Sequence, residues 1–167
     1  PSTTASQYVA GTNTATVVGG MAWTNSLGGG GTLALGGWSF TATLFTGTNV
    51  IIVRGTNVAG ATLADTVSVY RARAPYVNIT NANFSVSMND AQALISGTNN
   101  AGVVGFMSLQ SKTGAVVTYA ATLAAATPWA LTVSNLVIGA TNFATMTVTN
   151  DMGETATDTV EIYRRPM

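Results

Sequence analysis

The chain has 167 residues, with six basic and six acidic side chains, no cysteine and no histidine, and only 7% of its residues are charged. This balance gives no electrostatic field to attract nucleic acid or an anionic membrane, and a serine nucleophile would have no histidine to activate it. Polar residues or glycine interrupt every apolar stretch before it reaches the roughly 18 residues of a membrane helix. We therefore predict no membrane insertion, no enzyme activity and no cofactor.

The surface must be made soluble by Thr, Ser, Asn and Gly, because residues 1–53 contain no charged side chain. This composition is typical of extracellular bacterial modules, and of surfaces that pack against other protein with little charge repulsion. No signal peptide is visible at Pro1, so in a secreted protein that segment was removed or lies upstream. We predict an extracellular or cell-surface location in a bacterium or an archaeon.

Apolar and polar residues alternate along most of the chain, and this period of two predicts β-strands. In chain order, the predicted inward positions are Trp38, Phe40, Ala42 and Leu44, then Val67 and Val69, then Phe84, Val86 and Met88, then a strand from Trp129, and then Ala144, Met146 and Val148. SLGGGGT from Ser26 is predicted to be a loop, and the Ala-rich residues 120–126 a strand and loop. No helix longer than two turns is expected.

An internal repeat divides the chain. VAGTNTATVVGGMAW from Val9 returns at an offset of 86 as ISGTNNAGVVGFMSL from Ile95, and ADTVSVYR from Ala64 returns at an offset of 93 as TDTVEIYR from Thr157. Such repeats indicate tandem modules, which serve reach, adhesion or assembly more often than catalysis. We predict two domains, residues 1–74 and 75–167. The final YRRPM repeats the join before Pro75, so Pro166 is the expected start of a further module.

The first copy has a shorter beginning than the second. Before the shared GTN turn, the second copy spans residues 75–94, whereas the first spans only residues 1–8. The missing stretch corresponds to YVNITNANFSVS, which we predict to be an opening strand. Without it, the first domain would expose a groove lined by apolar side chains.

Three explanations of this deficit stay open. PSTTASQ covers the gap poorly, or the sequence was cut one strand short, or a neighbouring molecule supplies the strand by β-augmentation. The candidate interface residues under the third explanation are Tyr8, Val9, Phe84, Val86 and Met88.

The order of motifs in both copies resembles a known family. The first copy has Gly11, Trp38 before an alternating strand, Leu44 with Gly47, Asn49, Ile51 and Val53, then Asn57 with Gly60, and Asp65 to Val69 with Arg71; the second keeps Gly97, Trp129, Gly139, Asn142, Asn150, Gly153, Asp158 and Arg164. This pattern resembles the tandem immunoglobulin-like repeats of bacterial secreted and surface proteins. The resemblance implies an all-β fold of two tandem immunoglobulin-like β-sandwich domains with Greek-key connections.

Few side chains suggest a metal site. The weak calcium candidates are Asn150, Asp151, Glu154 and Asp158, because calcium prefers several oxygen ligands. Their spacing matches no EF-hand, and the first copy keeps only Asn57 and Asp65 of the set. A turn with a hydrogen-bonded Asp at the start of a strand is the favoured interpretation.

Aromatic, arginine and asparagine side chains allow two interpretations each. Three tryptophans could stack on sugar rings, but Trp38 and Trp129 begin alternating strands at equivalent places, which favours core packing. Trp23 is replaced by Leu109 in the second copy, which also suits a core position. Four arginines end the modules, where pairing with Asp or with carbonyl groups is expected: Arg71, Arg73, Arg164 and Arg165. Asn78 and Asn83 begin glycosylation triplets, although strand positions explain them as well.

The resemblance implies no single function, because such modules serve as spacers, adhesins, filament subunits and accessory domains of carbohydrate-active enzymes. The sequence favours a non-enzymatic extracellular structural or adhesive module, with head-to-tail assembly into a surface filament or array by β-strand complementation as its sharper form. The alternative is an accessory carbohydrate-binding or spacer module of a secreted carbohydrate-active enzyme. The expected partners are further copies of the chain or neighbouring immunoglobulin-like repeats, with surface glycans as a further candidate.

Overall fold

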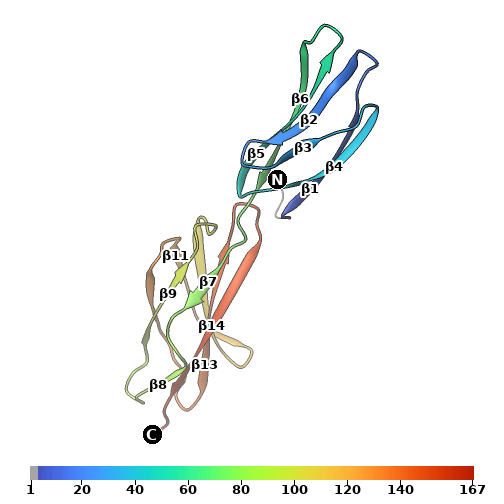
Figure 1. The fold of residues 1–167 in the computed structure, drawn as a ribbon. Helices are drawn as coiled ribbons and strands as arrows, with labels where there is room; N and C mark the ends of the chain where they lie inside the picture. The colour runs from blue at the N-terminus through green and yellow to red at the C-terminus, as the bar shows by residue number, and fades with distance from the viewer. Residues whose placement is uncertain (1–3) are drawn as a thin grey trace. The chain divides into compact units, whose positions relative to one another are not determined.

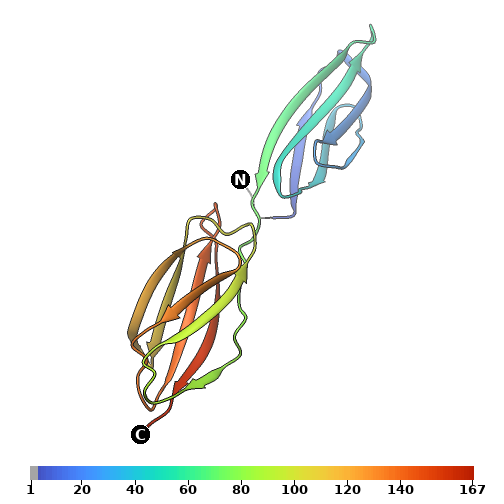
Figure 2. The same ribbon diagram turned by 90° about the vertical axis from the view of Figure 1, so that its left-hand side faces the viewer.

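The computed structural model describes residues 4–167, which form β-strands and connecting loops. The chain divides into two compact units, the first ending at Arg73 and the second beginning at Ala74. Each unit is built from two sheets, shown from two directions in Figures 1 and 2. The predicted all-β fold of immunoglobulin-like sandwiches is confirmed. Within residues 4–167, no helix has the length and apolar character that a membrane crossing requires.

The first unit has six strands in its described residues. They are β1 (Ser6–Thr12), β2 (Val17–Asn25), β3 (Gly30–Thr32), β4 (Gly37–Thr43), β5 (Gly47–Asn57) and β6 (Thr62–Arg71). β1 and β4 form a two-stranded antiparallel sheet, and the other sheet has the order β3-β2-β5-β6. Alternating side chains point into the unit, as in β4, where Ala42 is buried and Thr41 and Thr43 are exposed.

The second unit has eight strands. They are β7 (Val77–Ile79), β8 (Phe84–Val86), β9 (Ala93–Asn99), β10 (Phe106–Thr113), β11 (Val116–Ala124), β12 (Trp129–Val133), β13 (Thr141–Thr149) and β14 (Thr155–Arg164). One sheet has the order β12-β9-β7 and the other β11-β10-β13-β14-β8. The second unit therefore repeats the strand order of the first and adds β7 to one sheet and β8 to the other. These two strands lie in the green to yellow-green stretch in Figure 1.

The two units differ in how completely they bury their apolar side chains. In the second unit, buried residues from both sheets form one continuous cluster that includes Val133, Met146 and Ile162, each fully buried. Among the described residues of the first unit, the corresponding cluster contains Ala42, Leu44 and Ile51, with Val9, Trp23, Phe40 and Val69 partly buried around it. Because apolar burial is the main favourable term in folding, the first unit has the weaker core.

A buried asparagine ties the strands together in each unit. Asn142 Oδ1 accepts hydrogen bonds from Val137 N and Thr113 Oγ1, both at 2.9 Å. Its Nδ2 donates to the carbonyl oxygens of Val137, Ala140 and Ile162 at 3.2–3.3 Å. Asn49 makes the equivalent contacts in the first unit with Phe45 and Val69. The motif residues Asn49 and Asn142 therefore hold the loop after β4 or β12 against the neighbouring strand.

Replacing this asparagine is expected to be costly. Asn142→Ala leaves several buried backbone groups without a partner, so we expect the free energy of unfolding of the second unit to fall by about 2–4 kcal/mol. Urea unfolding followed by hydrogen exchange resolves the two units separately. Asn89→Ala, an exposed position in the same unit, is the control and should change this free energy by less than about 0.5 kcal/mol. A similar loss in both variants would contradict the assigned role.

Two local details differ from the sequence-based expectations. Part of the predicted loop from Ser26 forms β3, in which Gly31 pairs with Trp23 of β2. A side chain on Gly31 would lie 3.0 Å from Trp23 Nε1, so glycine lets the indole pack there. The predicted single opening strand is two short strands, β7 and β8, which join different sheets. The segment must cross between the sheets, and the residues between Ile79 and Phe84 make that crossing.

Candidate acceptor groove

The first unit leaves two strand edges open on the same side of its sandwich. In the second unit, β9 is flanked by β12 and β7, and β14 is flanked by β13 and β8. In the first unit, β1 pairs only with β4 and β6 pairs only with β5, among the described residues. Free strand edges carry unpaired N–H and C=O groups and are templates for pairing with another chain. Both edges border one groove.

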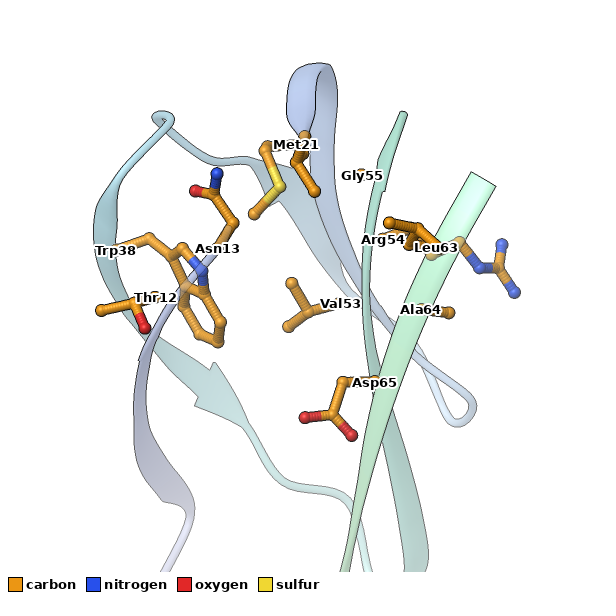
Figure 3. Close-up of a pocket in the computed structure, with 11 residues that line it drawn as sticks. Thr12, Asn13, Met21, Trp38, Val53, Arg54, Gly55, Leu63, Ala64 and Asp65 are labelled. Carbon is orange, nitrogen blue, oxygen red and sulfur yellow. The ribbon is translucent and has the colours of Figure 1, made fainter. Parts of the chain in front are cut away.

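The groove consists of two adjoining hollows. One wall is formed by β1 and β4, and the opposite wall by β5 and β6. Both hollows are lined by Trp38, Val53 and Asp65. Figure 3 shows Trp38 on one wall, Asp65 on the opposite wall and Val53 between them. The hollows measure about 170 and 150 Å³, and a cavity of about 150 Å³ holds a group as large as benzene. Each hollow can therefore admit an apolar side chain.

Two of the side chains that border the groove are less covered than their counterparts in the second unit. Val67 of β6 lines the groove and is 43% exposed, whereas the equivalent Val160 of β14 is 1% exposed. Val67 is thus directed as the alternation predicts, yet it is not buried, because no described strand lies over it. Trp38 is half-buried, whereas the equivalent Trp129 is 4% exposed.

In the second unit, residues 76–86 occupy the equivalent place. β7 runs antiparallel to β9, with Val77 opposite Asn99 and Ile79 opposite Gly97. Val77 and Ile79 are buried, at 5% and 7% exposure. β8 runs parallel to β14, and Phe84 and Val86 pack against the same core. This one segment thus completes both sheets, and Figure 2 shows it along one side of the second unit.

Three side chains anchor this segment by hydrogen bonds. The backbone N–H of Ile79 donates to Asp158 Oδ2 at 2.7 Å. Asn81 Oδ1 accepts from Ser96 N at 2.7 Å, on the edge of β9. Asn83 Oδ1 accepts from Glu161 N at 2.9 Å, on the edge of β14. The two asparagines thus cap edge N–H groups where the segment crosses from one sheet to the other.

The repeat places the start of the first copy relative to this segment. Leu44 N donates to Ala5 O, as Leu136 N donates to Ala91 O in the second unit, both within 2.9–3.1 Å. The offset of 86 makes Pro1 equivalent to Ser87, so a counterpart of residues 75–86 would stand before Pro1. Ser6 and Gln7 pair with Thr43 and Ala42 of β4. The described part of PSTTASQ therefore does not fill the groove, and Pro1, Ser2 and Thr3 lie outside the described residues.

The five candidate interface residues lie in two places. Val9 lines the groove, whereas Tyr8, its neighbour on β1, is 63% exposed. Phe84 and Val86 pack within the second unit, and Met88 O accepts from Arg164 Nε and Nη2 at 3.1 and 2.6 Å. Only Val9 thus borders the open site, and the assignment of all five to an interface stays a prediction.

The calcium candidates make hydrogen bonds within the protein. Asn150 Oδ1 accepts from Met152 N and Glu154 N at 3.0 and 2.9 Å, and its Nδ2 donates to Glu154 Oε2. Asp158 accepts from Thr159 N through Oδ1 and from Ile79 N through Oδ2. Residues 4–167 contain no group of three or more His, Cys, Asp or Glu side chains that could hold a metal ion. The structure thus gives Asn150, Glu154 and Asp158 hydrogen-bonding roles and offers no positive sign of calcium.

Trp23 and two of the terminal arginines make defined contacts within their units, whereas Arg73 and Arg165 are exposed. Trp23 stacks on Phe40 with ring centroids 4.3 Å apart. Arg71 Nη1 donates to Leu44 O at 2.6 Å, and the equivalent Arg164 Nη1 donates to Leu136 O at 2.7 Å. Pairing of these two arginines with carbonyl groups agrees with the sequence-based expectation.

Sequence patterns do not single out Asn81, and they mark Asn83 only as the start of a glycosylation triplet. The available signal is local: the sequence N-A-N stands between two apolar pairs, Val77 with Ile79 and Phe84 with Val86. Asparagine side chains readily bond nearby backbone groups and so favour breaks in strands. Their cross-sheet partners are distant in the sequence, so spacing alone does not reveal them.

Several solved structures are similar to this chain, among them the following three. Fibronectin(III)-like modules of Clostridium thermocellum CbhA show 14% identity over 96% of this chain and 86% of theirs, with a TM-score of 0.42. A Ca²⁺-stabilized adhesin that helps an Antarctic bacterium bind ice shows 20% identity over 96% of this chain and 44% of that one, with a TM-score of 0.35. Sidekick-1 immunoglobulin domains 1–4 show 16% identity over 87% and 43%, with a TM-score of 0.33.

This chain spans less than half the length of the adhesin and Sidekick-1 chains, and most of the length of the CbhA modules. No protein-family model matches the sequence, and no curated protein matches it significantly.

Proposed function

We propose that this chain is a non-enzymatic extracellular structural or adhesive module whose first unit accepts a β-strand from a neighbouring molecule. The supporting observation is the open groove of the first unit, at the place where the second unit holds residues 76–86. Proteins usually protect strand edges by charge, proline or coverage. Here β1 has no charged side chain and no proline, so the edge remains suited to pairing.

The arrangement favours an open-ended assembly. If another copy supplies the donor strand, the groove and that strand form a heterologous contact, which yields a filament unless the rotation closes a ring. The low charge of the chain reduces repulsion between copies. Main-chain hydrogen bonds would supply affinity, and side chains entering the hollows would supply specificity. Strand complementation thus gives the module a mechanical role in a surface filament or array.

A proline on the open edge of β1 tests this function. In the second unit, Ser96 N and Ser96 O both bond residues of the 75–86 segment. Ala10 is equivalent to Ser96 by the offset of 86, so its N–H faces the open edge. Proline is tolerated on such an edge but cannot donate to an added strand. Ala10→Pro should therefore leave the first unit folded and abolish assembly.

Assembly is measured by sedimentation velocity over a range of concentrations and by electron microscopy of the purified chain. Ala10→Thr keeps the N–H and suits a strand, so it should assemble like the unchanged protein. The function is contradicted if the unchanged chain remains monomeric at all concentrations or if Ala10→Pro assembles normally. Discrete particles that cosediment with insoluble polysaccharide would instead favour an accessory carbohydrate-binding module.

A further inference from the structure

The polar contacts of residues 75–86 specify what kind of strand fits the first unit. We propose that the strand completing the first unit follows the pattern apolar-x-apolar-x-Asn-x-Asn-apolar-x-apolar, and that Asp65 fixes its register by accepting a backbone N–H. This inference rests on the proposed strand complementation and names the partner: an extended segment of another polypeptide with the chemistry of residues 77–86 of this chain.

The first apolar pair matches the hollows of the groove. In the second unit, the buried side chains of this pair, Val77 and Ile79, lie beside β9. In the first unit, the equivalent space beside β1 is lined by Val9, Trp38 and Val53 and contains no described strand. Two hollows beside one strand edge suit two side chains on alternate residues, because alternate residues of a strand point to the same face.

The second apolar pair matches the open edge of β6. Phe84 lies opposite Ile162, and Val86 lies opposite Arg164, in the parallel pairing of β8 with β14. The equivalent residues of β6 are Val69 and Arg71 by the offset of 93. The donor must therefore run antiparallel to β1 in its first half and parallel to β6 in its second half. This sets its direction as well as its composition.

The two Asn positions match N–H groups on opposite edges. Asn81 and Asn83 accept from Ser96 N and Glu161 N in the second unit. The equivalent donors in the first unit are Ala10 N on β1 and Ser68 N on β6. A donor strand with side-chain carbonyls at these two positions would satisfy both groups when it covers them, which matters because buried backbone groups without a partner are costly.

Asp65 is positioned to accept a hydrogen bond from the backbone of the donor strand. Its Oδ1 accepts from Thr66 N at 2.8 Å, as Asp158 Oδ1 accepts from Thr159 N at 2.9 Å. This bond fixes the carboxylate on the groove wall, facing Trp38 across the hollow in Figure 3. In Asp158 the second oxygen binds the N–H of Ile79. An ionised carboxylate only accepts hydrogen bonds, so the donor needs an N–H at the Ile79 position.

A synthetic peptide tests the pattern. A peptide of residues 75–86, with acetylated and amidated ends, is titrated into the 167-residue chain, and binding is followed by calorimetry. We expect saturable binding that protects the amides of β1 and β6 from hydrogen exchange. A peptide of the same composition in scrambled order should not bind. The second unit should show no new protection, because its own segment already fills the place.

Two matched changes test the role of Asp65. Asp65 is exposed, and Asp65→Asn keeps one oxygen acceptor of the side chain while it removes the second oxygen acceptor. This change should weaken peptide binding roughly 10- to 100-fold. A peptide that is N-methylated at the Ile79 nitrogen keeps every side chain, and its affinity should fall by a similar factor. If both changes remove the same hydrogen bond, the fold-loss of affinity with both changes together should be clearly smaller than the product of the two separate fold-losses.

A set of peptide variants tests the two asparagines without altering the protein. Replacing Asn81 and Asn83 by Ala in the peptide should weaken binding by roughly 10-fold or more. The inference is overturned if the native-order peptide binds no better than the scrambled one, or if Asp65→Asn and the two asparagine replacements leave its affinity unchanged. Failure of self-assembly would contradict the proposed function alone, since the peptide can bind a protein that remains monomeric.

Discussion

Attaching residues 75–86 directly in front of Pro1 is expected to raise the unfolding temperature of the first unit by roughly 8–16 °C. The added segment is the stretch of the second copy whose counterpart would stand before Pro1. Because Pro1 is equivalent to Ser87, Val86 of the added segment directly precedes Pro1 in this variant. The variant would therefore carry its own donor strand and resemble the second unit in topology.

The expected gain comes from covering a groove that is now open to water. Val77 and Ile79, buried in the second unit, each contribute about 1.5–3 kcal/mol when fully buried, and Val67 would become covered as well. These values are upper limits, and ordering the segment costs conformational entropy. We expect a net gain of at least about 2 kcal/mol, and for a domain of this size each kcal/mol corresponds to about 4–8 °C.

Hydrogen exchange with mass spectrometry reports each unit separately during thermal unfolding. The control carries the same segment in scrambled order and should leave the first unit unchanged. The attached strand should also prevent assembly, because the groove is filled within the same molecule. An unchanged unfolding temperature would show that the groove does not accept this segment, and continued assembly would show that copies associate through another surface.

The strand pattern and the open position could be predicted from the sequence because both follow from local information. A period of two marks Trp38, Phe40 and Ala42 as one face of a strand. The shorter beginning of the first copy is visible once the copies are aligned at the GTN turn. The first observation predicts β-strands and the second a first copy with a shorter beginning, whereas the sandwich is implied by the resemblance to immunoglobulin-like repeats.

The chemistry of the groove could not be predicted in the same way. Whether Val67 is covered depends on a strand that starts elsewhere in the chain, so alternation gives its direction and not its burial. The contact of Ile79 N with Asp158 joins residues 79 positions apart. The division of residues 76–86 into two strands depends on how two sheets face each other, which a single-sequence pattern does not encode.

Val160→Asn is expected to lower the free energy of unfolding of its unit by several kcal/mol more than Val67→Asn lowers that of its own unit, although the two valines are equivalent in the repeat. Val160 is 1% exposed within the core of the second unit. Asparagine at this position removes apolar packing and buries an amide without a hydrogen-bond partner. The free energy of unfolding of the second unit should therefore fall by about 3–5 kcal/mol. Val67 is 43% exposed, and the same change should cost the first unit less than about 1 kcal/mol.

The measurement is the free energy of unfolding of each unit from urea-dependent hydrogen exchange, at a concentration where the chain is monomeric. Val67→Asn should also weaken binding of the 75–86 peptide, because its amide would be covered on binding. A large loss of stability in Val67→Asn would mean that this side chain is already covered in the isolated molecule. The first unit would then be closed by its own chain, and a donor strand would have no open groove to enter.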